Sequence, residues 1–167
     1  MITNKWINGS DDISDALKIR SEVFEKELKM TVEPEEDEND ELSLHLVLYD
    51  EAEPCATGRI YHDGKTFRIG RCAVLKEKRG MGMGDMLVKL LLLKTFTYNP
   101  SEIVISSRLV QAPFYEKYGF VKTGEVYEEA GEPHIKMSVN KETLRFPSKC
   151  GSVKKFEDLF EERHVGE

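Results

Sequence analysis

Cysteine is scarce in this chain of 167 residues, which contains only Cys55, Cys72 and Cys150. The three are far apart in the sequence, and no C-x-x-C pair occurs. This spacing argues against a disulfide framework and against a zinc site built on cysteine. Because unpaired cysteines are typical of a reducing compartment, we expect a cytoplasmic protein.

Long hydrophobic runs and an excess of positive charge are also absent. No stretch approaches the roughly 18 uncharged apolar residues of a membrane-spanning helix, and residues 1–6 lack the profile of a signal peptide. The formal net charge is −7, and the isoelectric point is about 5.3. Affinity for nucleic-acid phosphates rests on clustered Lys and Arg. We therefore expect neither a membrane protein nor a nucleic-acid-binding protein, and the acidity favours an amine as partner.

The composition is that of a soluble globular protein, with 40% hydrophobic and 33% charged residues. A chain of this length suits one domain, or one domain with an appendage. We predict a domain at residues 1–140 and a C-terminal extension at residues 141–167. Residues 156–163 have the pattern of a short amphipathic helix within that extension.

Hydrophobic periodicity and turn residues predict a mixture of strands and helices. A helix is expected behind the capping residues Ser10, Asp11 and Asp12. The Asp63-Gly64 pair predicts a hairpin, because both central positions favour positive φ. The other expected elements are strands at 43–49, 55–61, 67–74, 103–106, 121–127 and 134–139 and helices at 82–97 and 113–117. Since a helix links the third and fourth of these strands, they should run parallel within a mixed α/β (α+β) sheet.

A glycine-rich segment, Arg79-Gly80-Met81-Gly82-Met83-Gly84, separates the strand at 67–74 from the long apolar helix. Glycines let the backbone turn several N–H groups inward, and a helix N-terminus adds partial positive charge. The layout is typical of a phosphate or pyrophosphate site. The dinucleotide fingerprint G-x-G-x-x-G is not present, and neither is the Lys-Ser or Lys-Thr of a P-loop. A simple glycine turn with a helix cap is the alternative.

The loop matches R-x-x-G-x-G and resembles the pyrophosphate loop of the GNAT superfamily of N-acetyltransferases. Further blocks occur in an order that resembles the ElaA-like branch of that superfamily. They are R-x-x-V-F at 20–24, D-x-x-D at 37–40 followed by His45, F-Y-x-x-x-G-F at 114–120 and E-x-G-x-P-H-I-x-M at 129–137. The resemblance runs from about residue 15 to residue 139.

Two departures from the branch concern the acceptor side. Glu25-Lys26-Glu27 stand where the branch usually has Val-Glu-Gln, and Arg108 stands where it often has glutamine. The acceptor of this protein is therefore expected to differ from those of its relatives.

The resemblance implies a GNAT-type fold, with a mostly antiparallel central sheet, two splayed parallel strands and flanking helices. It implies acetyl-CoA as co-substrate and direct transfer without a metal. The backbone of the bulged strand would pair with pantetheine, and one amide near Val74 would face the thioester oxygen. The residues implied in cofactor binding are Cys72, Ala73, Val74, Arg79, Gly80, Met81, Gly82, Met83, Gly84 and Asp85.

The resemblance makes Tyr115 the general acid that protonates the leaving thiolate. The alternative is a tyrosine that packs over the coenzyme without transferring a proton. His134 and His45 are candidates for the general base, because imidazole titrates in the right range. Both could instead be structural, with water as the base. The acidic residues Glu36, Asp37 and Asp40 either attract a cationic amine or form a solvated loop.

The sequence thus predicts an N-acetyltransferase that moves acetyl from acetyl-CoA to a primary amine of a small molecule or peptide. A GNAT fold that only senses acyl-CoA, or that serves as an interaction module, is the alternative. Because members of the superfamily are often dimers, the resemblance also allows for a homodimer. The identity of the acceptor and the use of other acyl groups stay open.

Overall fold

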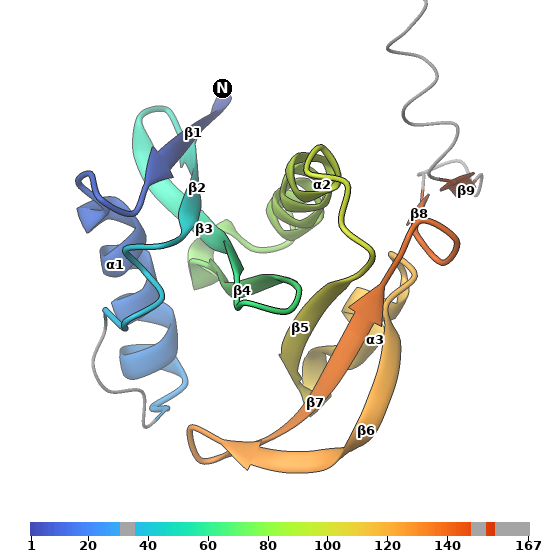
Figure 1. The fold of residues 1–167 in the computed structure, drawn as a ribbon. Helices are drawn as coiled ribbons and strands as arrows, with labels where there is room; N and C mark the ends of the chain where they lie inside the picture. Colours follow the sequence, from blue (N-terminus) through green and yellow to red (C-terminus); the bar gives the residue numbers. More distant parts are fainter. Residues whose placement is uncertain (31–35, 148–152, 156–167) are drawn as a thin grey trace, which may run out of the picture. The chain divides into compact units, whose positions relative to one another are not determined.

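The computed structural model describes residues 1–30, 36–147 and 153–155 (Figure 1). It divides into two compact units, Met1–Asn99 and Pro100–Glu167. Each unit has its own sheet strands and helices, and each is described by itself below.

The first unit contains four strands that pair in sequence order, each antiparallel to the next. They are β1 (Ile2–Asn8), β2 (Leu44–Asp50), β3 (Glu53–His62) and β4 (Phe67–Val74). The three predicted strands of this region and the hairpin at Asp63-Gly64 are confirmed. Strand β1 was not predicted. It is an edge strand in which only Ile7 is buried, so the alternation of hydrophobic and polar residues is too weak to predict a strand.

Two helices cover opposite faces of these strands. Helix α1 (Ser14–Arg20) continues into a π-helical segment, η1 (Ser21–Glu27), and packs on Val47 and Ala73. Helix α2 (Met83–Phe96) lies against the other face, where Gly58 leaves room for it. A Cβ at Gly58 would lie 2.6 Å from the Leu91 side chain, so glycine lets this helix approach β3 closely. A short 3₁₀ turn, η2 (Lys76–Lys78), precedes the glycine-rich loop.

The second unit places β7 (Glu132–Val139) between two antiparallel neighbours, β5 (Ile103–Arg108) and β6 (Val121–Glu129). A 3₁₀ turn, η3 (Leu109–Gln111), leads into α3 (Ala112–Glu116). Gly119 ends this segment at φ +90°, and a Cβ there would lie 1.8 Å from the Thr143 carbonyl oxygen. Only glycine fits that position, which accounts for the glycine of the F-Y-x-x-x-G-F block.

The chain beyond residue 140 continues the second unit for several residues. Leu144 and Phe146 are buried, and the Phe146 ring meets Tyr118 edge-on. Strands β8 (Arg145–Pro147) and β9 (Val153–Lys155) form an antiparallel pair. The helix predicted at residues 156–163 lies outside the described residues.

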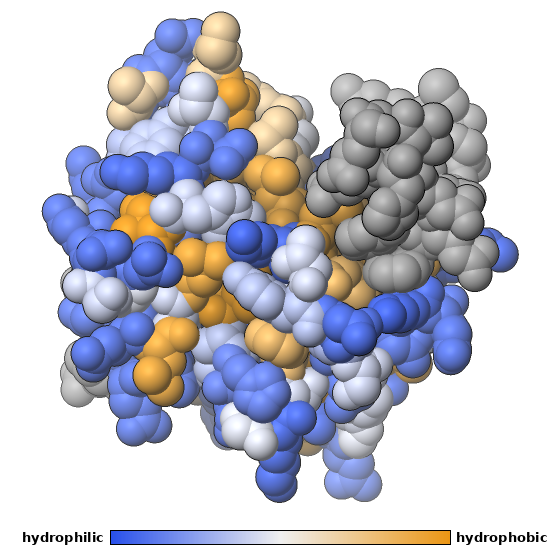
Figure 2. Space-filling view, turned by 45° about the horizontal axis from the view of Figure 1, so that its top comes forward, coloured by the Kyte–Doolittle hydropathy of each residue, from blue (hydrophilic) through white to orange (hydrophobic). Residues whose placement is uncertain are grey.

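The surface and the cysteines agree with the composition. On the face shown in Figure 2, hydrophilic residues cover most of the surface and hydrophobic ones emerge between them. Cys55 is buried and Cys72 is half-buried, and no disulfide joins them to another described residue; Cys150 lies outside the described residues. Within the described ranges, every helix is too short or too polar to cross a membrane.

Candidate active site

Strand β4 carries a β-bulge just before the residues predicted to bind the cofactor. Thr57 pairs with Ala73 and Arg59 pairs with Gly70, so β4 has one residue more than β3 over this stretch. Arg71 takes up the extra length at φ +49°. A non-glycine residue in this region costs roughly 1–2 kcal/mol, which surrounding contacts must offset. The bulge expected from the resemblance is therefore present.

The glycine-rich loop is open where an anion is expected. Gly80 and Gly82 both have φ +80°, and a Cβ added to either would meet nothing within 4 Å. Helix α2 begins at Met83, directly after Gly82, and Met83 itself is buried. The first amides of a helix have no intrahelical acceptor. Left-handed glycines, unfilled space and a helix N-terminus together form a site suited to a phosphate group.

Arg79 is held by two parts of the first unit. Its Nη1 and Nη2 lie 2.5 Å and 2.7 Å from the two carboxylate oxygens of Glu27. Its Nε donates to the carbonyl oxygen of Val74 at 3.0 Å. The arginine therefore links the glycine loop to the end of β4 and to the η1 segment. Sequence reasoning placed Arg79 near the pyrophosphate but missed Glu27 as its partner.

Tyr115 lies on α3 of the second unit and is half-buried. Its ring meets the Phe120 ring edge-on, with centroids 5.8 Å apart. Phe114 also contacts it edge-on, and Phe114 packs in the same way on the buried Tyr118. The aromatic residues of the F-Y-x-x-x-G-F block thus fix the position of the tyrosine. Its role as a general acid stays a prediction.

His134 lies on the central strand of the second unit and is 4% exposed. Its cross-strand partners are Arg108 on β5 and Tyr127 on β6. Nδ1 lies 2.9 Å from the Glu132 carbonyl oxygen, which can only accept, so Nδ1 carries a hydrogen. Nε2 lies 3.5 Å from a carboxylate oxygen of Glu129. The side chain is oriented by its neighbours, and its role as a base stays a prediction.

His45, the other candidate base, lies on β2 of the first unit and is 1% exposed. Its Nε2 donates to the backbone carbonyl oxygen of Asp40 at 2.9 Å. Burial lowers the pKa of His45 below its ordinary value of 6.5, although the contact with Asp40 opposes this shift. The ring is therefore a neutral, buried hydrogen-bond donor in this structure.

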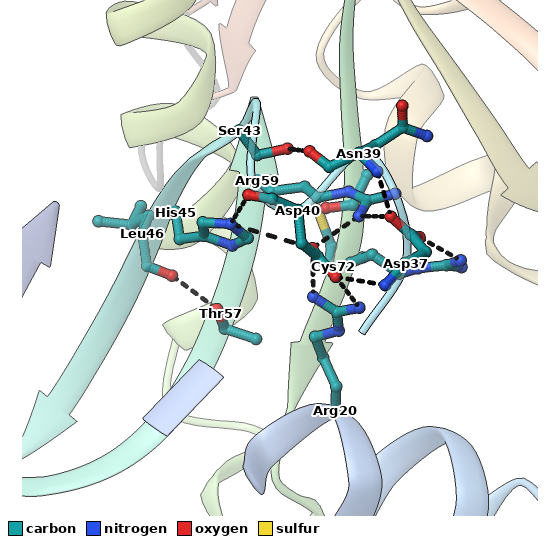
Figure 3. A network of polar contacts seen from close by, with 12 residues as sticks. Arg20, Asp37, Asn39, Asp40, Ser43, His45, Leu46, Thr57, Arg59 and Cys72 are labelled. Atoms are coloured by element: carbon teal, nitrogen blue, oxygen red, sulfur yellow. Dashed lines mark hydrogen bonds and ion pairs between the residues drawn. The ribbon is translucent and has the colours of Figure 1, made fainter. Parts of the chain in front are cut away.

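Asp40 is the centre of a buried ionic network that continues from His45 (Figure 3). It is 0% exposed, and Arg20 reaches it from α1 with two hydrogen bonds of 2.7 Å and 3.0 Å. Nη1 of Arg59 donates at 2.7 Å to Asp40 and at 2.7 Å to Asp37. Asp37 also accepts a bond of 3.0 Å from Arg71 at the bulge. The network thus joins α1, β3 and β4.

The arginines keep both carboxyls ionised. Burial alone would raise the pKa of Asp40, but the hydrogen bonds from Arg20 and the Asp37 amide hold it below 3.8. The pKa of Asp37 is lowered in the same way by Arg59 and Arg71, again against burial. The idea that these aspartates belong to a solvated loop is therefore wrong for Asp40, which is fully buried because three basic and hydrogen-bonding neighbours replace its water. Glu36 remains exposed.

Sequence reasoning missed the arginines of β3 and β4. Arg59 interrupts an otherwise small and apolar strand between Ala56 and Ile60, and this unusual position was the available signal. The first unit brings together the glycine loop, the β4 bulge and the ionic network, and the second holds Tyr115 and His134. Within the described residues, no group of three or more His, Cys, Asp or Glu side chains is placed to hold a metal ion.

Comparison with known proteins agrees with this architecture. The model of the acetyltransferase (GNAT) domain family matches residues 10–141. The uncharacterized N-acetyltransferase YjcF of Bacillus subtilis is 32% identical over 128 residues, which cover 76% of this chain and 91% of YjcF.

Two solved structures resemble the chain over 83% of its length and 99% of their own. An acyl-CoA N-acyltransferase from Pseudomonas aeruginosa has a TM-score of 0.75 and 26% identity. Escherichia coli ElaA has a TM-score of 0.75 and 27% identity. These likenesses confirm the predicted mixed α/β GNAT fold and support acyl transfer from an acyl-CoA donor. The chain therefore belongs to the GNAT acetyltransferase family.

Proposed function

We propose that the protein transfers an acetyl group from acetyl-CoA to a primary amine. The observation that carries this proposal is the open glycine loop at the start of α2, with Gly80 and Gly82 both in the left-handed region. A solved GNAT acetyltransferase from Elizabethkingia anophelis, with a TM-score of 0.62 and 20% identity, has acetyl-CoA bound. It supports the choice of donor.

The backbone of the first unit would bind the donor. Amides of the loop and of the first turn of α2 would hold the pyrophosphate. The edge of Cys72–Val74, just after the bulge, would pair with the pantetheine amides. An amide near Val74 would stabilise the oxyanion of the tetrahedral intermediate.

The chemistry balances without a metal. The neutral amine attacks the thioester carbonyl, and a new C–N bond forms as the carbonyl electrons move to oxygen. Collapse of the intermediate breaks the C–S bond, and Tyr115 gives its proton to the departing thiolate. The attacking nitrogen loses a proton to His134, to His45 or to water. His134 fits this role better, because His45 donates its Nε2 hydrogen to a backbone carbonyl in a fully buried position.

The test is release of free thiol from acetyl-CoA when the full chain is mixed with a panel of primary amines. We expect thiol release that depends on both enzyme and amine and yields the acetylated amine by mass spectrometry. Calorimetry with acetyl-CoA runs in parallel. Binding with no thiol release from any amine would indicate an acyl-CoA sensor, and an absence of binding would contradict the donor assignment.

A further inference from the structure

The bulge of β4 decides which backbone groups of this strand face away from β3. Successive residues of a β-strand direct their backbone N–H groups to alternate edges. Thr57 and Arg59 are two residues apart on β3, but their partners Ala73 and Gly70 are three residues apart on β4. The extra residue therefore exchanges the two sets of backbone groups after the bulge. Without it, each later amide of β4 would point to the opposite edge of the strand.

Arg71 takes up the extra length, and its backbone conformation is unusual for an arginine. Its φ is +49°, in the left-handed region. Bulge residues in this region are typically glycine, because a Cβ is disfavoured there. The glycine of this segment, Gly70, lies one residue earlier. An arginine at position 71 therefore needs contacts of its side chain to keep the bulge in place.

The carboxylate of Asp37 supplies such a contact and connects the two strands at the bulge. Nη2 of Arg71 donates to one carboxylate oxygen of Asp37 at 3.0 Å. Nη1 of Arg59 donates to the other oxygen at 2.7 Å. Arg59 is the cross-strand partner of Gly70, the residue before the bulge. Asp37 thus links the residue that forms the bulge to the strand opposite it.

Asp37 is held in place by groups other than Arg71. The backbone amide of Asn39 donates to its carboxylate at 2.9 Å (Figure 3), and its own amide donates to the Asp40 carboxylate at 2.8 Å. Its side chain is 18% exposed, and both of its oxygens accept hydrogen bonds. Such a carboxylate is suited to fixing a strand, and it is poorly placed to attract an amine from solution.

We infer that Asp37 is a positioning residue for acyl transfer, which it serves by holding the bulge at Arg71. The inference rests on the proposed function, in which an amide near Val74 faces the thioester oxygen. Because the bulge sets the edge to which that amide points, its loss would turn the oxyanion donor away from the thioester. The oxyanion charge develops in the transition state, so the effect should fall on kcat. The glycine loop, which is expected to hold the pyrophosphate, would be kept.

The first test replaces Asp37 by Asn, which removes the charge and keeps the size of the side chain. We expect kcat for thiol release to fall at least tenfold, while the Kd of acetyl-CoA changes less than threefold. Glu38→Gln removes one charge from the exposed neighbouring position and is the matched control, which should keep the native kcat. An unchanged kcat in Asp37→Asn would overturn the inference.

A second substitution separates positioning from a general loss of stability. Arg71→Gly lets the bulge form without support from a side chain, because glycine adopts positive φ freely. Added to Asp37→Asn, it should raise kcat at least fivefold above that of Asp37→Asn alone. If Asp37 only stabilised the fold, the double variant would lose still more contacts and would be no more active than Asp37→Asn. That outcome would refute the positioning role.

The strand register can be measured even where no turnover is observed. NMR should show the cross-strand contact between Thr57 and Ala73 in the native protein. In Asp37→Asn this contact should weaken in favour of one between Thr57 and Cys72, and it should return in the double variant. If the native protein releases no thiol but the register changes in this way, the role of Asp37 in the bulge stands and the proposed function does not. If the contact between Thr57 and Ala73 is unchanged in Asp37→Asn, the inference is wrong.

Discussion

Glu27 and Arg79 form a two-bonded ion pair across 52 residues of sequence, at 2.5 Å and 2.7 Å. The pair joins the end of the η1 segment to the first residue of the glycine loop. Arg79 is the cation closest in sequence to the predicted pyrophosphate site, and Glu27 is where the chain departs from its relatives' usual pattern. We therefore predict that the Glu27 carboxylate competes with the coenzyme for this arginine.

Replacement of Glu27 by Gln should strengthen acetyl-CoA binding by about two- to fivefold. The neutral amide frees charge on Arg79 for the pyrophosphate, while the bond from Nε to Val74 keeps the arginine in place. Calorimetry at low ionic strength measures the effect, since salt screens it. Glu22→Gln, in the same segment and paired with Lys26, is the control and should change nothing. Weaker binding in Glu27→Gln would show that the ion pair organises the loop and does not compete with the ligand.

Replacement of Gly82 by Glu should weaken acetyl-CoA binding by more than tenfold. The new side chain would put a carboxylate in the open space where the pyrophosphate is expected. Because φ is +80° at this position, part of any loss could come from backbone strain. Gly64→Glu provides the matched control, since Gly64 is also left-handed and open but lies in the hairpin turn. Unchanged affinity in Gly82→Glu would refute the assignment of the loop.

Removal of the Tyr115 hydroxyl in Tyr115→Phe should lower kcat by about 100-fold, within the range of general acid catalysis, with little change in coenzyme affinity. The ring contacts with Phe114 and Phe120 are kept, so the fold should be unaffected. Steady-state kinetics with a saturating amine and calorimetry with acetyl-CoA separate the two effects. Tyr98→Phe, at an exposed tyrosine, is the control. Full activity in Tyr115→Phe would make Tyr115 a packing residue.

The buried network predicts loss of stability in acid. The folded-state pKa values of Asp37 and Asp40 lie below 3.8, so the unfolded chain takes up these protons first as the pH falls. Their stabilising contribution is complete above about pH 4 and is lost below it. His45 adds to this trend from pH 6.5 downward, because its folded-state pKa also lies below its ordinary value.

Asp40→Asn should lower the free energy of unfolding by about 3–5 kcal/mol at pH 7, because it leaves two buried arginines short of a counter-charge. The difference in Tm from the native protein should narrow as the pH falls below 3.8, because the native chain then takes up a proton at residue 40 on unfolding and loses the stability that the ionised carboxylate supplies. Thermal unfolding between pH 3 and pH 7 tests this, with Asp11→Asn at an exposed position as the control. A constant difference in Tm across that range would contradict the role assigned to Asp40.

The structure confirmed those parts of the sequence analysis that depend on local signals. The glycine loop, the helix that follows it and the hairpin at Asp63-Gly64 are set by residues close together in the chain, because backbone conformation and helix capping are local properties. The order of the motif blocks was enough to identify the GNAT fold. The need for glycine at position 119 follows in part from a local property, its positive φ. The close approach of the Thr143 backbone to Gly119 depends on the tertiary structure.

The sequence alone could not give the partners of the charged residues. The sequence around Asp37 and Asp40 has the pattern of a solvated surface loop. Only the pairing of β2, β3 and β4 brings Arg59 and Arg71 to these aspartates. Which charged side chains meet depends on which strands pair and in what register. The register is decided by the packing of the whole sheet face. The sequence by itself therefore determined the family, the fold and the position of the glycine-rich loop. The tertiary structure decided that Asp37 and Asp40 pair with Arg20, Arg59 and Arg71, because strand pairing and the packing of α1 bring residues from distant parts of the chain together.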